Sequence, residues 1–264
     1  MSRKNGRHRN KHNNYYNDYR TGDPKVIELQ TNTPPFDAPA KHPQPPKPIQ
    51  AKNQSQARFM AAIRRNTLVF GLGPAGTGKS YCTAGMAAEA LLAGKIDRVI
   101  FTRPAIETGK SLGFLPGKLE DKFDPYFSAF KSCLISNAGK GVVDCALKNG
   151  NIVVEPLAYM RGKTFDHCFV ILDEAQNCTS EEIKMFMTRI GRNSTVVING
   201  DLSQTDLDNC SGLYDAINRV HDVCGVHVHE FTYEDIVRSG IVKDIIMKYE
   251  ISNPPGYRFC STFA

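Results

Sequence analysis

The residues best suited to chemistry form a glycine-rich loop at positions 73–80, GPAGTGKS, which fits the pattern G-x-x-x-x-G-K-[ST]. Its glycines permit backbone angles that turn successive N–H groups inward around a phosphate. Lys79 adds a positive charge near the β- and γ-phosphate oxygens, and the Ser80 hydroxyl can coordinate Mg²⁺. We therefore predict nucleotide binding by the whole loop: Gly73, Pro74, Ala75, Gly76, Thr77, Gly78, Lys79 and Ser80.

A pair of acids follows an apolar run in CFVILDEAQN (168–177). The run predicts a strand, which places both acids at the edge where open α/β sheets bind ligands. Asp173 can complete a Mg²⁺ site opposite Ser80, and Glu174 can orient and deprotonate an attacking water. The alternative is an exposed acidic turn. A base poised over water favours ATP hydrolysis over transfer to another acceptor.

Two glutamines are candidates for further nucleotide contacts. Gln204 follows the apolar run of STVVINGDLSQTDL (194–207) and can bond the γ-phosphate or the attacking water, unless the segment is an ordinary polar loop. Gln56 precedes the strand that enters the glycine-rich loop, and its amide can read an adenine edge, with Gln54 as a rival.

Two loops supply candidate contacts to nucleic-acid phosphates. The segment 101–126 is rich in Gly and Pro, and 155–165 repeats its arrangement after another strand. Each basic side chain alone is more typical of a solvated surface charge, but two such loops on the nucleotide side favour a joint track. The candidates are Thr102, Arg103, Lys110, Lys118, Arg161 and Lys163.

Short apolar runs that alternate with helical stretches must position these residues. Such alternation predicts an α/β fold, a mostly parallel sheet covered by helices, in a single copy. NQSQARFMAAIRRN has helical spacing at Phe59, Ala62 and Ile63, and Gly94 can end the helix after the phosphate loop. The predicted strands lie in TLVFGLG, RVIFTRP, NIVVEP, CFVILDE and TVVING.

Composition divides the 264-residue chain into three parts. Residues 1–50 are basic and then Pro-rich, which predicts a disordered leader that serves as a spacer or as a nucleic-acid-binding arm. Residues 1–20 carry a charge of +5 of the total +6, so the rest of the chain is nearly neutral. Residues 51–250 form the predicted domain, and 251–264 a tail without a functional signal.

Several classes of protein are disfavoured. No apolar run approaches the roughly 18–20 residues that span a bilayer, and no apolar segment near the N-terminus suits a secretory signal. The eight cysteines occur singly, without the spacing of a zinc site, which predicts reduced thiols and a cytoplasmic protein without membrane partners.

The motifs in their order resemble the PhoH-like (phosphate-starvation-inducible) ATPase family, compact phage-type members in particular. The resemblance rests on GPAGTGKS, TRPAIETGKSLGFLPGKLEDKFDPY, EPLAYMRGKTF, VILDEAQN, NGDLSQTDL and FTYEDIVRSGIV. It implies a single RecA-like core related to superfamily 1 helicases, with ATP and Mg²⁺ as ligands. It also implies RNA helicase activity and ring assembly, as attributed to some members.

Carried over to single residues, the resemblance supports Lys79 and Ser80 for phosphate and Mg²⁺, and the Asp173–Glu174 pair as Walker B. It adds Gln176 beside Gln204 as sensors of the γ-phosphate. Arg238 matches a family arginine, although Ser239-Gly240 follows it here in place of His-Pro.

We therefore expect an Mg-dependent ATP hydrolase that acts on single-stranded nucleic acid, RNA rather than DNA. Because one core offers one moving surface, a homo-oligomer, such as a ring, would supply the second. Arg238, then Arg189 and Arg192, are candidates to reach a neighbour's γ-phosphate, an effect of roughly 10³–10⁵ in rate. The alternatives are a protein-remodelling ATPase without nucleic acid and a small-molecule kinase.

Overall fold

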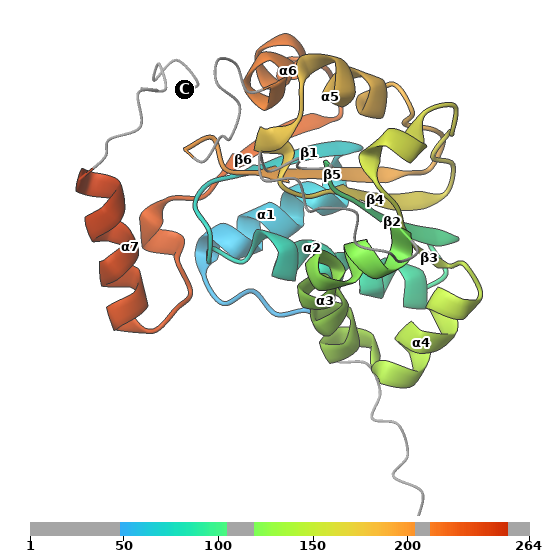
Figure 1. Cartoon of the computed structure of the whole chain (residues 1–264), viewed down its shortest axis with the longest axis horizontal. Helices are drawn as coiled ribbons and strands as arrows, with labels where there is room; N and C mark the ends of the chain where they lie inside the picture. Colours follow the sequence, from blue (N-terminus) through green and yellow to red (C-terminus); the bar gives the residue numbers. More distant parts are fainter. Residues whose placement is uncertain (1–47, 105–118, 204–211, 253–264) are drawn as a thin grey trace, which may run out of the picture. The chain divides into compact units, whose positions relative to one another are not determined.

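The computed structural model describes residues 48–104, 119–203 and 212–252, with the backbone alone given at 119–126 and 249–252. Its centre is a six-stranded sheet in the order β3-β2-β4-β5-β1-β6, in which every neighbouring pair is parallel (Figure 1). The strands are β1 (Leu68–Leu72), β2 (Arg98–Thr102), β3 (Ile152–Val154), β4 (Cys168–Leu172), β5 (Thr195–Gly200) and β6 (Val226–Glu230).

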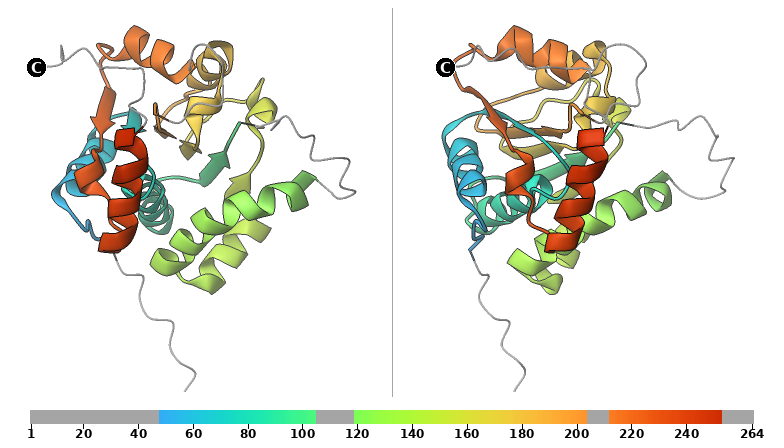
Figure 2. Two further views of the ribbon diagram at one scale, coloured as in Figure 1. Left: turned by 60° about the vertical axis from the view of Figure 1, so that its left-hand side comes forward. Right: turned by 90° about the vertical axis from the view of Figure 1, so that its left-hand side faces the viewer.

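Helices cover both faces of the sheet, as the views in Figures 1 and 2 show. One face is covered by α1 (Gln54–Arg65), α2 (Lys79–Leu92), α3 (Leu119–Ala138) and α4 (Lys140–Lys148). The other is covered by the 3-10 helices η1 (Leu157–Met160) and η2 (Ala175–Asn177), and by α5 (Ser180–Met187) and α6 (Gly212–Val220). The chain continues into η3 (Tyr233–Asp235) and α7 (Gly240–Ser252).

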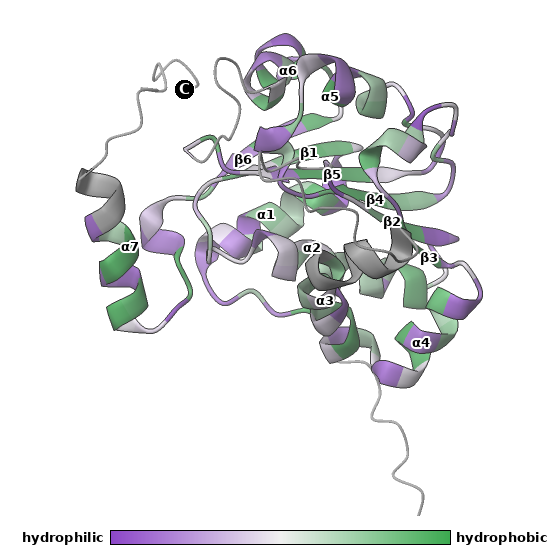
Figure 3. Cartoon of the chain, viewed as in Figure 1, coloured by the Kyte–Doolittle hydropathy of each residue, from purple (hydrophilic) through white to green (hydrophobic). Residues whose placement is uncertain are grey.

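The core consists of two apolar clusters, one on each face of the sheet. Neighbouring residues of β1 point to opposite faces, so Val69 packs in the first cluster and Phe70 in the second. Strands that are buried on both sides are mainly apolar, as the sequences of β1 and β4 show, and much of the central sheet has the hydrophobic colour in Figure 3. This arrangement confirms the predicted α/β class, a parallel sheet flanked by helices.

The strand order brings the polar loops together. Strands β1, β4 and β5 are neighbours and end at Leu72, Leu172 and Gly200. We call the side of the sheet where these strands end the carboxyl edge, and the side where they begin the amino edge. Because all the strands are parallel, the glycine-rich loop and both acids of the predicted Walker B pair lie at the carboxyl edge.

The predicted helices and five of the strands are confirmed. Phe59, Ala62 and Ile63 of α1 are buried as expected. After α2, Gly94 takes a left-handed conformation (φ +64°), which ends the helix. The sixth strand, β6, was not predicted because VHVHE carries two histidines, and it lies at an edge of the sheet where only His229 is buried.

Described residues lie on both sides of each predicted domain limit. Ile49, which falls in the predicted leader, is buried, and its N–H donates to Glu89 Oε1 over 2.7 Å. Helix α7 continues to Ser252, and the remainder of the leader and tail lies outside the described residues. Within the described part of the chain, no helix combines the length and apolar character needed to cross a membrane.

Candidate nucleotide site

The glycine-rich loop connects β1 to α2, and its backbone requires glycine. Gly73, Gly76 and Gly78 have positive φ angles of 127°, 85° and 92°. A Cβ at Gly73 would lie 2.3 Å from the carbonyl oxygen of Phe231, and one at Gly78 would lie 2.4 Å from Gln56 Nε2. Packing around the loop therefore excludes side chains where the chain must turn to present its N–H groups.

Lys79 and Ser80 begin α2 and face the acids of the neighbouring strands. The Lys79 ammonium donates to the carbonyl of Gly73 and, over 2.9 Å, to that of Pro74. Burial lowers the pKa of Lys79, while the negative charges of Asp201, Asp173 and Glu174 oppose this shift. The ammonium is thus held within the loop, where a phosphate can replace the carbonyls as its partner.

Asp173 contacts Ser80 across the sheet. The Ser80 hydroxyl donates to Asp173 Oδ1 over 3.4 Å. Burial raises the pKa of Asp173, and the nearby charge of Glu174 raises it further, against the opposing effects of Arg103 and Lys79. A hydroxyl and a carboxylate oxygen side by side are hard donors of the kind that Mg²⁺ prefers, so this pair fits the predicted metal site.

Glu174 is held through both oxygens of its carboxylate. Arg103 Nη2 lies 2.9 Å from Oε1, and Gln176 Nε2 donates to Oε2 over 2.6 Å. The backbone of Glu174 has a φ of 55°, a left-handed conformation that is uncommon outside glycine. The predicted base is therefore fixed in an unusual conformation by two neighbours, one of which, Arg103, was predicted to contact nucleic acid.

Gln56 and Gln176 form hydrogen bonds between the segments that make up the site. Gln56 is 1% exposed, its Nε2 donates to the Thr77 carbonyl over 2.8 Å, and its Oε1 accepts from Lys52 N–H. Gln176 is also buried, and its Oε1 accepts from the N–H of Asp201 over 3.1 Å. The rival Gln54 is exposed. The predicted contacts of Gln56 with adenine and of Gln176 with the γ-phosphate stay predictions.

A cavity of about 420 Å³ lies over the loop and is lined by residues of all three strand ends. Arg238 lines it too, because Val237 N–H donates to the Gly76 carbonyl over 3.0 Å. A Cβ at Gly76 would lie 3.3 Å from Arg238 Cγ. Arg238 thus lies on the loop of its own chain, whereas Arg189 and Arg192 precede β5 at the amino edge.

Asp201 is a site residue to which the sequence analysis gave no role. It follows β5 directly, lines the same cavity and is 6% exposed. Its Oδ1 accepts from the N–H and the hydroxyl of Ser203, while its Oδ2 is buried without a hydrogen-bond partner among the described residues. Its signal in the sequence was an acid directly after a predicted strand, although Asn199 and Gly200 separate it from the apolar run, whereas Asp173 follows its apolar run directly.

The predicted nucleic-acid contacts are divided by the structure. Thr102 is fully buried at the end of β2, so its side chain is not available to a surface ligand, which corrects that prediction. Lys163 pairs with Glu155, and Arg161 is exposed. Lys110, Lys118 and the predicted sensor Gln204 lie outside the described residues.

Comparisons with known proteins agree with these motifs. A family model described as "PhoH-like protein" matches residues 48–250. The chain is 44% identical over 212 residues to a PhoH-like protein of Mycobacterium tuberculosis strain H37Rv, covering 80% of this chain and 60% of the relative. It is 45% identical over 209 residues to a Bacillus subtilis PhoH-like protein (78% and 66%), and 43% identical over 206 residues to Protein PhoH of Escherichia coli K12 (76% and 58%).

Solved structures resemble the chain only distantly. The ATPase core of Sulfolobus solfataricus SWI2/SNF2 in complex with dsDNA has a TM-score of 0.42 at 14% identity, covering 71% of this chain and 46% of that one. A Pif1 helicase structure at forked dsDNA has a TM-score of 0.29 at 15% identity, covering 70% and 44%. The chain spans about 60% of the length of the curated relatives that it matches. On the family match and these identities, the chain belongs to the PhoH-like family.

Proposed function

We propose that the protein is an Mg-dependent ATP hydrolase. The observation that carries this proposal is the contact between Ser80 of the phosphate loop and Asp173 at the end of β4. It brings a phosphate-binding loop, a hard-oxygen pair suited to Mg²⁺ and the carboxylate of Glu174 to one cavity. These are the parts that hydrolysis of a nucleoside triphosphate requires.

Each part has a role in the reaction. The N–H groups of the glycine-rich loop and the Lys79 ammonium hold the β- and γ-phosphates of ATP. Glu174 takes a proton from a water as the water oxygen bonds to the γ-phosphorus. The bond from that phosphorus to the bridging oxygen breaks, which leaves ADP and phosphate. Mg²⁺, held by Ser80 and Asp173, would neutralise charge on the phosphate oxygens. Gln204 and Gln176 would respond to the γ-phosphate.

The test is Glu174→Gln, which keeps the shape of the side chain and removes its basicity. We expect kcat for ATP to fall by roughly 10²–10⁴, the usual contribution of a general base, while ATP still binds. Glu181→Gln is the matched control, because Glu181 is exposed on α5, away from the cavity. Turnover in Glu174→Gln equal to that of the parent would rule out Glu174 as the base.

We further propose that single-stranded nucleic acid, RNA in preference to DNA, stimulates the hydrolysis. The exposed Arg161 and the half-exposed side chain of Tyr159 lie together in and after η1, and they suit contacts to phosphate and base. ATPase activity with and without a single-stranded RNA, at low and at high salt, tests this partner. Salt-sensitive stimulation would support it, whereas its absence would favour a protein partner.

We also propose that the protein acts as a homo-oligomer in the cytoplasm. Helix α7 and the turn before it expose apolar side chains: Val237 is 37% exposed, Ile241 71% and Ile245 50% (Figure 3). A solvent-facing apolar helix of this kind suits burial against a second copy of the chain. Mass measurement with and without ATP tests the assembly, and a monomer in both conditions would exclude it.

A further inference from the structure

We infer that Arg103 is a positioning residue. Its guanidinium restrains Glu174 until the phosphate of a nucleic acid replaces Glu174 as its partner. This inference rests on the proposed function, because it assigns to Arg103 the control of the proposed base. Its subject is the ion pair between Arg103 Nη2 and Glu174 Oε1, 2.9 Å apart at the carboxyl edge of the sheet.

The carboxylate of Glu174 is engaged on both sides in the described structure. Oε1 pairs with Arg103, and Oε2 accepts from Gln176 over 2.6 Å. Bonds to a charged guanidinium are among the stronger hydrogen bonds in proteins and fix the direction of the carboxylate. These two partners occupy one lone-pair site on each oxygen and fix the direction of the carboxylate, so turning it towards an attacking water must break at least one of the two contacts. The ion pair therefore describes a restrained state of the base.

Arg103 is also the point where the site meets both loops proposed to contact nucleic acid. Its carbonyl accepts from Leu157 N–H over 3.1 Å, which ties it to η1 and thus to the segment that carries Arg161. Its chain continues after Pro104 into the other loop. The carbonyl of Thr102, one residue earlier, accepts from the N–H of Asp173 over 3.0 Å. A ligand held by the η1 segment would therefore lie on a part of the chain that is hydrogen-bonded to the residue that holds Glu174.

An exchange of partners is chemically reasonable at this position. A phosphate diester offers the guanidinium two oxygens in the same geometry as a carboxylate, so it can compete with Glu174 for Arg103. The Arg103 side chain is 15% exposed and that of Glu174 is 40% exposed, so solvent reaches the pair.

The test is Arg103→Ala, assayed for ATP turnover with and without a single-stranded RNA. We expect basal kcat to rise by roughly five-fold, the scale of a partly exposed ion pair, with the KM for ATP unchanged. Stimulation by RNA should be lost, because the variant no longer has the Arg103–Glu174 ion pair that RNA would break. Arg103→Lys keeps the charge and should restore a low basal rate. Arg219→Ala is the matched control, since it breaks the Arg219–Asp215 pair on α6, away from the cavity.

Two outcomes would overturn the inference. A basal kcat that falls in Arg103→Ala would show that Arg103 prepares Glu174 for catalysis, and an unchanged kcat would show that the pair has no control over it. The double variant Arg103→Ala/Glu174→Gln must lose the raised turnover, since the effect acts through Glu174. If Arg103→Ala fails to fold, Arg103→Gln provides the same readouts.

The experiment also separates this inference from the proposed function. If RNA does not stimulate the parent but Arg103→Ala still raises basal kcat, the restraint is retained and nucleic acid is rejected as its release. If neither the parent nor Arg103→Ala hydrolyses ATP, the proposed function itself fails.

Discussion

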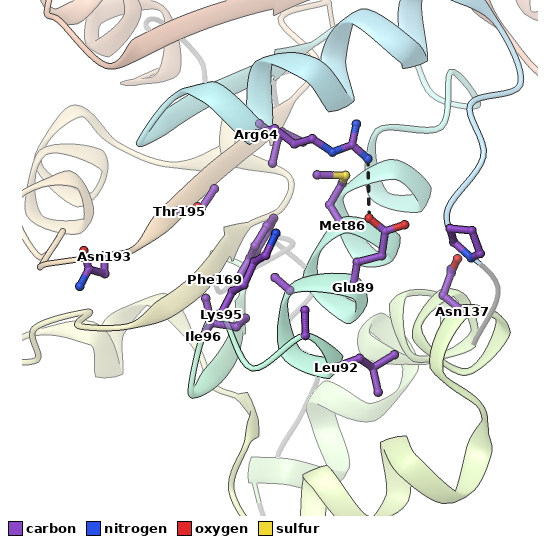
Figure 4. A pocket seen from close by; sticks show the side chains of 14 residues that line it. Arg64, Met86, Glu89, Leu92, Lys95, Ile96, Asn137, Phe169, Asn193 and Thr195 are labelled. Atoms are coloured by element: carbon purple, nitrogen blue, oxygen red, sulfur yellow. Dashed lines mark ion pairs between the residues drawn. The ribbon is translucent and has the colours of Figure 1, made fainter. Parts of the chain in front are cut away.

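The cavities at the two edges of the sheet differ in the chemistry of the residues that line them. The cavity at the amino edge, about 830 Å³, is larger than the cavity of about 420 Å³ over the glycine-rich loop. Figure 4 shows its lining, which includes Met86, Leu92, Ile96 and Phe169, with one ion pair across its rim. The smaller cavity gathers three carboxylates, two lysines and two glycines with positive φ.

This difference has a topological cause. Every strand of the sheet is parallel, so the loops that leave the strands gather at the carboxyl edge, together with the N-terminus of α2. The amino edge receives the ends of helices and the starts of strands. The comparison shows that the convergence of polar groups identifies the candidate site here, and that cavity volume does not.

Exchanging a glycine for alanine at each edge should give the strongest contrast. In Gly78→Ala the new Cβ would lie 2.4 Å from Gln56 Nε2 at a φ of 92°, so the loop must distort. We expect the affinity for Mg·ATP to fall by roughly 1,000-fold, or about 4 kcal/mol. Gly94→Ala, at the end of α2, meets nothing within 4 Å and has a φ of 64°.

The Gly94→Ala variant is the control for that contrast. Its left-handed conformation should cost about 1 kcal/mol of unfolding free energy, with ATP affinity unchanged. Titration calorimetry and thermal unfolding of both variants measure the two quantities. Equal losses of ATP affinity in the two variants would remove the distinction between the edges.

Acid should lower the free energy of unfolding through His229, which lies near the carboxyl end of β6. Burial lowers the pKa of His229 from 6.5 to about 4, and the neighbouring His227 adds to the shift. The unfolded chain therefore binds more protons between pH 6.5 and 4, and the free energy of unfolding falls as the pH falls through that range. The loss is at most about 3 kcal/mol.

The variant His229→Gln isolates this effect from other titrating groups. The ring of His229 contacts Phe59 of α1 at a centroid distance of 5.3 Å, and its Nε2 lies 3.1 Å from the Ser55 hydroxyl. Chemical denaturation at pH 7 and pH 5 should show a smaller pH dependence in the variant than in the parent. Equal pH dependence would mean that His229 does not carry the effect.

The smallest expected effect is at the amino edge. Arg64 Nη2 lies 3.6 Å from Glu89 Oε2 at the rim of the larger cavity, and the Arg64 side chain is 53% exposed (Figure 4). We expect Arg64→Ala to change the free energy of unfolding by less than about 1 kcal/mol and to leave ATP affinity unchanged. A loss of ATP affinity, measured by titration, would indicate that the nucleotide binds at the amino edge and not at the carboxyl edge.

Local sequence patterns were sufficient for much of the fold and for the parts of the site that are local themselves. The phosphate loop is one continuous motif, and Asp173 and Glu174 follow an apolar run directly. Strand β6 lacked such a signal, because an edge strand is solvated on one side and VHVHE has no continuous apolar run.

Contacts between distant segments could not be predicted in the same way. Arg103 and Glu174 are 71 positions apart, and a basic residue in a loop gives no indication of which acid it meets. The same holds for Arg238, whose contact with Gly76 depends on how the chain returns after β6. Thr102 appeared to belong to a surface loop, yet it is the buried last residue of β2.

The most direct test of the carboxyl-edge site is equilibrium binding of Mg·ATP to the parent and to Lys79→Ala, measured by titration calorimetry. Lys79 is the one lysine that the cavity shares with the phosphate loop, among the residues that the structure describes. We predict saturable binding to the parent and an affinity lower by roughly 100-fold in the variant, from the loss of a buried charge beside the phosphates. Unchanged affinity in Lys79→Ala would contradict the assignment of this loop as the nucleotide site.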